Sequence, residues 1–74
     1  MEIKDFVEKF TELFDDTDAS EITPTTEFRE LEEWGSLISM SLIAMFKTEF
    51  NKTISGKDIR GCKTVEDLYN IAIG

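Results

Sequence analysis

The first fourteen residues carry the most regular pattern of apolar and polar positions in the chain. Their apolar side chains recur three and four residues apart, which places them on one face of a helix; they are Ile3, Phe6, Val7, Phe10, Leu13 and Phe14. The spacing predicts an amphipathic helix over residues 2–14. Residues 15–35 show no such period, and they hold the only proline, Pro24, and the apolar anchors Ile22, Phe28, Leu31 and Trp34. We predict a long ordered loop with one short turn at residues 28–31, and loops of this length commonly serve a function.

A second helix is predicted from Leu37 to Phe50, where the sequence contains neither glycine nor proline. Ser36 is placed as its N-cap, since serine is favoured at that position. Apolar residues occur on both sides of this helix. One broad arc holds Ser39, Leu42, Ile43, Phe46 and Phe50, with Met40 at its margin, and the opposite side holds Leu37, Ile38 and Met45. The pattern therefore indicates either a central helix or a helix with an exposed binding face.

The remaining elements are predicted from their caps. Ser55 is placed before a brief helical turn at residues 56–60, which Gly61 ends. Thr64 and Asp67 form a capping-box pattern ahead of a last helix, whose apolar residues are Val65, Leu68, Tyr69, Ala72 and Ile73. No segment alternates as a strand would. The prediction is one all-α domain over residues 1–74, a four-helix bundle with three main helices, one short helix and a long loop between the first two.

The composition excludes several classes of function. The chain has 74 residues, 16 acidic and 8 basic side chains, a formal charge of −8, no histidine and one cysteine. Such a short chain holds no deep substrate cavity, and it lacks an imidazole base and a multi-cysteine zinc site, so we expect no enzyme. Its acidity disfavours nucleic acid and anionic membranes as partners. No apolar run approaches the ~20 residues of a spanning helix and no targeting segment opens the chain, so a cytoplasmic protein is expected.

Two candidate chemistries are disfavoured by their surroundings. Four side chains fit positions 1, 3, 5 and 12 of a 12-residue EF-hand frame, namely Asp16, Asp18, Ser20 and Glu27. However, Glu21 replaces the required glycine and Pro24 occupies position 9, so no metal site is predicted. A solvated loop whose Asp and Ser residues cap or turn the backbone is favoured instead. Cys62 has no histidine to activate it and is predicted to be a buried or half-buried thiol.

Ser36 is the most informative single residue. It follows Gly35, ends the long loop and opens the second helix. A phosphate ester at this position would face free backbone N–H groups and the positive end of the helix dipole. By itself, a serine before a helix is more often a simple N-cap. A nucleophilic catalytic serine is disfavoured, because the chain has no histidine to accept its proton.

Several short motifs are more informative together than alone, because they occur in the same order as in a known protein family. Together they cover nearly the whole chain. They are Ile22-Thr-Pro24, Phe28-Arg-Glu-Leu31, Glu33-Trp34-Gly35-Ser36-Leu37, Phe46-Lys-Thr-Glu-Phe50, Ile54 and Lys63-Thr-Val65-Glu-Asp-Leu68. In this order the chain resembles an acyl carrier protein. The resemblance implies a four-helix bundle with a short third helix and a monomeric carrier in fatty-acid or secondary-metabolite biosynthesis. It also implies that Ser36, between Gly35 and Leu37, receives 4′-phosphopantetheine from coenzyme A through a phosphopantetheinyl transferase. The terminal thiol of that group would carry acyl or aminoacyl thioesters, which ligases and synthases load and use.

Two departures from the family pattern lead to hypotheses. Gly35 stands where the family usually has Asp, which removes a carboxylate expected to help the modification step. The second helix also lacks most of the acidic residues that fatty-acid carriers present to partners. We therefore hypothesise that Leu37, Ile38 and Met45, with Trp34 beside them, dock a dedicated partner by apolar contact. The competing interpretation is that some of these residues pack under the loop.

Two functions remain open from the sequence. The first is a non-catalytic carrier that is modified at Ser36 and shuttles thioester-linked intermediates between separate enzymes. The alternative is an unmodified, carrier-like interaction module that binds a partner through the apolar side of its second helix. Gly35 is the best support for this alternative.

Overall fold

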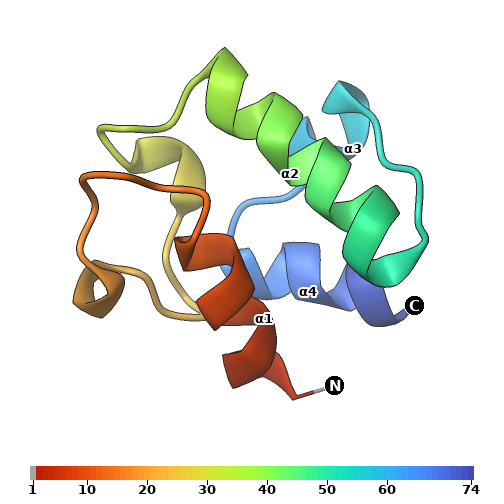
Figure 1. Ribbon diagram of the computed structural model, residues 1–74, viewed down its shortest axis with the longest axis horizontal. Helices are drawn as coiled ribbons and strands as arrows, with labels where there is room; N and C mark the ends of the chain where they lie inside the picture. Colours follow the sequence, from red (N-terminus) through yellow and green to blue (C-terminus); the bar gives the residue numbers. More distant parts are fainter. Residues whose placement is uncertain (1) are drawn as a thin grey trace.

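The computed structural model describes residues 2–74, and these form a bundle of helices joined by a long loop (Figure 1). The helices are α1 (Ile3–Thr11), α2 (Ser36–Phe50), α3 (Gly56–Arg60) and α4 (Val65–Ile73), and α4 contacts both α1 and α2. Two single 3-10 turns, Ala19–Glu21 and Phe28–Glu30, lie within the loop between α1 and α2. No strand occurs among residues 2–74, so the predicted all-α, four-helix fold is confirmed.

Helix α1 ends at Thr11, earlier than the predicted Phe14. The Thr11 hydroxyl donates to the Val7 carbonyl at 2.8 Å, and the N–H groups of Leu13 and Phe14 donate to carbonyls only three residues back. These bonds tighten the end of the helix into turns. Phe14 still reaches the core, because its side chain is buried although its backbone has left the helix.

Helix α2 begins one residue earlier than predicted, which corrects the role of Ser36. Gly35 is the N-cap, with extended backbone, and its carbonyl accepts the Ser39 N–H at 2.9 Å. Ser36 is therefore the first helical residue and not the cap. At the other end Asn51 adopts the left-handed conformation with φ of 54°, a position that Asn tolerates better than most residues.

The predicted caps of α3 and α4 are confirmed. Ser55 and Asp58 exchange side-chain and backbone hydrogen bonds, as do Thr64 and Asp67. Hydrogen bonds from the N–H of Thr64 and then that of Lys63 hold the pKa of Asp67 below its ordinary value. The first turn of α4 also holds the long loop in place. The Val65 N–H donates to the Thr26 carbonyl at 3.0 Å, and the Glu66 N–H donates to the Pro24 carbonyl at 2.9 Å.

The core is built around one connected set of aromatic rings. Phe6 of α1 lies at its centre and meets four other rings at centroid distances of 5.7 to 6.4 Å, those of Phe10, Phe46, Phe50 and Tyr69. Phe10 extends the set to Phe28 in the loop, and Phe28 packs edge-on against Trp34 at 4.9 Å. The aromatic core thus reaches a residue two positions before Ser36, which anchors the start of α2.

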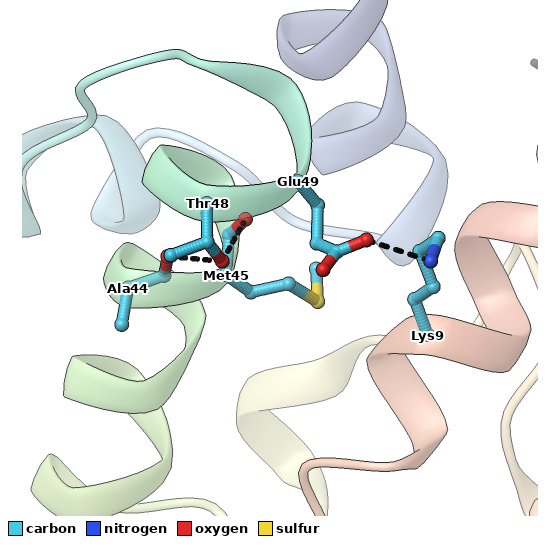
Figure 2. A network of polar contacts seen from close by, with 5 residues as sticks. All are labelled: Lys9, Ala44, Met45, Thr48 and Glu49. Carbon is cyan, nitrogen blue, oxygen red and sulfur yellow. Dashed lines mark hydrogen bonds and ion pairs between the residues drawn. The ribbon is translucent and has the colours of Figure 1, made fainter.

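The expected exposure of Ile38 and Met45 on α2 is wrong. Both side chains are buried, with 7% and 8% exposure, whereas Leu37 is 77% exposed. The buried residues of α2 follow the spacing i, i+4, i+7 and i+8; they are Ile38, Leu42, Met45 and Phe46. Figure 2 shows the Met45 side chain extending toward α1, beside the ion pair that Glu49 forms with Lys9 at 2.8 Å. The side of α2 that faces the core is therefore wider than the predicted arc and is rotated toward Ile38 and Met45.

Candidate functional site

Ser36 lies at the exposed start of α2, directly after the long loop. Within the described part of the chain its hydroxyl has no hydrogen-bond partner. Because the chain also lacks histidine, no imidazole is present to deprotonate it. The hydroxyl is thus accessible to another enzyme but is not activated by the protein itself.

The first turn of α2 provides a favourable environment for a phosphate ester. The N–H groups of Ser36, Leu37 and Ile38 precede the first intrahelical bond, which the N–H of Ser39 makes. They lie at the positive end of a 15-residue helix, and no acidic residue occurs in its first turn. These residues fit a phosphate-linked group carried on the serine.

Gly35 leaves space beside Ser36. Its φ and ψ of −177° and −171° describe extended backbone that other residues also adopt, and a Cβ placed there would meet no heavy atom within 4 Å. Glycine is therefore not required at this position by backbone strain or crowding. The Cβ of an aspartate, the residue usual here in the acyl carrier motif, would lie in open space.

Glu33 fixes the loop that leads to the site, a role that the sequence analysis missed. Its carboxylate accepts the N–H groups of Asp15 and Asp16 at 2.8 and 3.0 Å and the Thr17 hydroxyl at 2.8 Å. These bonds join the two ends of the loop. The hydrogen bond from the Asp15 N–H is the largest cause that lowers the pKa of Glu33 below its ordinary value.

This geometry predicts an acid-sensitive loop. A carboxylate whose pKa is lowered on folding contributes stability above its unfolded pKa, and that contribution is lost as pH falls through the folded value. We expect the hydrogen-exchange protection of the Asp15 and Asp16 amides to decline below pH 4.5, which is the ordinary pKa of a glutamate such as Glu33. Glu33→Gln should lower this protection already at neutral pH. The neighbouring Glu32 is exposed and supplies the control, since Glu32→Gln should leave the protection of these amides unchanged. An equal loss of protection in both variants would contradict the role of Glu33.

The acidic loop residues have structural roles of the kind that the sequence favoured. The Asp18 carboxylate accepts the Ser20 N–H at 3.0 Å, which lowers its pKa, and Glu21 accepts the Asp18 N–H at 3.3 Å. This reciprocal arrangement caps the first 3-10 turn. Among residues 2–74 no three acidic or cysteine side chains gather as a metal site would require.

Cys62 is buried, as predicted. Burial raises the pKa of its thiol, and the nearby carboxylates of Asp67 and Asp58 raise it further. The thiol therefore stays protonated near neutral pH and is a poor nucleophile.

The proposed contact residues do not form one surface. Leu37 is exposed, Trp34 is half-buried against Phe28, and Ile38 and Met45 lie in the core. Met40, which was placed at the margin of the core arc, is 68% exposed. Its position three residues after Leu37 was the signal that could have assigned it to the same exposed stripe.

No helix within residues 2–74 has the length and apolar composition needed to cross a membrane. Comparisons with curated proteins and with solved structures find no match. A comparison with protein-family models matches residues 2–71 to the family described as the phosphopantetheine attachment site. This match spans α1, the loop, Ser36, α2, α3 and most of α4, and it confirms the resemblance to acyl carrier proteins. The chain therefore belongs to the phosphopantetheine attachment family, whose members are non-catalytic carriers with a covalently attached 4′-phosphopantetheine.

Proposed function

We propose that this protein is a cytoplasmic carrier that bears 4′-phosphopantetheine on Ser36 and shuttles acyl or aminoacyl thioesters between separate enzymes. The observation that carries the proposal is the exposed, unbonded Ser36 hydroxyl at the first turn of α2, inside the segment that matches the family. Its partners would be a phosphopantetheinyl transferase and the ligases and synthases of fatty-acid or secondary-metabolite biosynthesis.

The modification step assigns a simple role to each part of the site. The Ser36 oxygen forms a bond to the pantetheine-side phosphorus of coenzyme A, 3′,5′-ADP leaves, and the hydroxyl proton passes to the transferase. The first N–H groups of α2 favour the resulting phosphodiester charge. When attached, the group supplies the thiol that forms thioesters. Cys62 is the only cysteine of the chain and it is buried, so its thiol would not compete with the thiol of the attached group for the cargo.

A second function is favoured by the departures at the site. Gly35 replaces the usual Asp of the family motif, and two apolar side chains, Leu37 and Met40, are exposed on α2. An unmodified module that binds a partner through this helix would have the same features.

Intact-mass measurement separates the two functions. The protein is incubated with coenzyme A and a phosphopantetheinyl transferase of broad carrier range, and we expect a mass gain of one phosphopantetheinyl group. Ser36→Ala should abolish the gain. Ser39→Ala, which removes a half-buried serine on the same helix, should retain it.

A third variant tests the unusual glycine. The Cβ that Gly35→Asp adds lies in open space, and aspartate is a favoured N-cap, so this variant should be loaded faster and be about 0.3 kcal/mol more stable. Loading of Gly35→Asp but not of the natural sequence would support the unmodified module. Loading that persists in Ser36→Ala would contradict the assigned attachment residue.

A further inference from the structure

Charge is distributed unevenly along the chain, and one segment is cationic. Residues 47–63 contain five basic and two acidic residues, a net charge of +3, whereas the rest of the chain carries −11, which together give the total of −8. Residues 34–46, which include Ser36 and most of α2, contain no charged side chain. The first charged side chains that follow Ser36 along the chain are therefore those of the cationic segment.

The two carboxylates of this segment are already occupied within the protein. Glu49 pairs with Lys9 of α1 at 2.8 Å, and Asp58 accepts the Ser55 N–H at 2.9 Å in the cap of α3. Three exposed cations of the segment have no ion-pair partner among residues 2–74; these are Lys47, Lys57 and Arg60. The segment thus presents positive charge that the fold leaves unpaired.

These cations lie on the sides of α2 that are turned away from α1. Lys47 follows Ser36 by 11 residues, or about three helical turns, so the two side chains share one exposed face of α2. Met45 lies about half a turn away from that face and points toward α1 (Figure 2). In Figure 1, α2 passes between α1 and α3, the helix that carries the other two cations. The exposed face that starts at Ser36 therefore leads to positive charge.

Lys57 and Arg60 form a pair of like charges on one face of α3. They stand three residues apart, a spacing at which helical side chains are neighbours. The Arg60 guanidinium lies back over the first turn of the helix, where a Cβ built on Gly56 would be 3.4 Å from its Nη1 atom. Like charges this close repel each other, and a bound anion would relieve their repulsion. An anionic group is therefore the ligand that this pair favours.

The interior of the bundle is filled by packed aromatic rings. Phe6, Phe10 and Phe46 have no exposed surface, and their ring contacts link α1 with α2. An aliphatic chain inserted among them would separate these rings. Two hollows at the surface, of about 280 and 230 Å³, are lined mostly by charged side chains, which include Glu32, Glu33, Lys9 and Glu49. These features favour a cargo that stays at the surface.

We infer that the cargo is a short acyl group that ends in a carboxylate, held at the surface by Lys47, Lys57 and Arg60. The inference rests on the proposed function and names its class of cargo. The group attached to Ser36 would be a long flexible chain, so its thioester end would not be confined to the first turn of α2. The carboxylate of the cargo would be attracted by the three cations, whose charge counters the repulsion from a chain that is acidic as a whole.

An acidic partner protein is a poorer ligand for the same cations. Such a partner would also approach the rest of the chain, which carries −11 and would repel it. A carboxylate tethered through Ser36 brings one negative charge to the cations, and the tether raises its effective concentration beside them. The tethered anion is therefore favoured.

The test compares two cargoes of equal length on the natural sequence. A phosphopantetheinyl transferase of broad carrier range loads Ser36 from adipoyl-coenzyme A or from hexanoyl-coenzyme A, whose acyl groups have the same number of carbons and differ by a terminal carboxylate. Backbone amide NMR signals of the two loaded forms are recorded at neutral pH. We expect the signals of residues 47 and 57–60 to differ between the two forms, and those of Phe6 and Phe46 to coincide. The difference should shrink in high salt, because exposed charges are screened.

Removal of positive charge assigns the effect to the cations. Lys57→Gln combined with Arg60→Gln should reduce the difference between the adipoyl and hexanoyl forms about twofold or more, in line with the modest strength of exposed ion pairs. The matched control is Lys4→Gln, which removes an exposed cation of α1 and should leave the difference unchanged. An equal reduction in the control would show a general charge effect and would contradict the assigned contact residues.

The outcomes separate the inference from the proposed function. If the natural sequence is loaded but its adipoyl and hexanoyl forms give the same spectrum, the cations do not hold the cargo and the carrier function stands. A decanoyl group that shifts the signals of Phe6 and Phe46 would also overturn the inference, since a long aliphatic chain would then enter the core. If no transferase loads the natural sequence, the proposed function falls and the inference falls with it.

Discussion

Phe6→Ala is expected to lower the free energy of unfolding by about 3–5 kcal/mol, the usual cost of removing a fully buried aromatic side chain. Phe6 has no exposed surface and its ring meets four others, from α1, α2 and α4. A chain of this length has a total stability of about 4–11 kcal/mol. The variant should therefore populate the unfolded state measurably without denaturant.

Equilibrium urea unfolding, followed by circular dichroism, measures this loss. Phe50→Ala is the matched control, because it removes the same side chain from a half-buried position in the same aromatic set. Its cost should be clearly smaller. Equal costs at the two positions would show that Phe6 is not the centre of the core.

Ile38→Glu should be the second strongly destabilising change, although its neighbour tolerates the same substitution. Ile38 is buried, so the variant loses about 1.5–3 kcal/mol of apolar burial. It must also place a carboxylate in the core, which brings the expected total to about 3 kcal/mol or more. Leu37→Glu should change stability by no more than about 0.5 kcal/mol, because Leu37 is exposed.

Thermal and urea unfolding of the two variants side by side provide the measurement. Similar stability of Ile38→Glu and Leu37→Glu would contradict the orientation of α2 described above. The pair also separates folding from docking: loss of loading in Leu37→Glu with intact stability would point to the surface, whereas loss in Ile38→Glu would reflect unfolding.

The sequence predicted those elements whose signals are local. Ser55 was recognised as a cap and Thr64 with Asp67 as a capping box, and both signals are local, so α3 and α4 were placed correctly. The same type of pattern, Asp18 with Glu21, also caps a 3-10 turn, and it was overlooked because no apolar run follows it. The early end of α1 was missed because its apolar period continues to Phe14 while the backbone does not.

Long-range packing explains the remaining errors. Apolar residues surround α2, so the sequence alone did not determine which arc would face α1 and α4. The spacing of Ile38, Leu42 and Met45 was an available signal, but it competed with an equally apolar arc. Likewise Glu33 bonds to a residue 18 positions earlier, which no local pattern indicates. The proposal that Ser36 and Gly35 form the attachment site rests on sequence order rather than on side-chain packing.

The contact between Phe28 and Trp34 offers a way to follow modification of Ser36 and partner binding by fluorescence. Trp34 is the only tryptophan of the chain, is half-buried, and stands two residues before Ser36. Its indole therefore provides an intrinsic fluorescent reporter beside the proposed attachment residue, and no label has to be introduced. The centroids of the Trp34 and Phe28 rings are 4.9 Å apart, so the fluorescence of the unmodified, unbound protein comes from an indole in a defined environment. Attachment at Ser36, or an enzyme covering Leu37, would be read in real time as a change in emission wavelength or quenching.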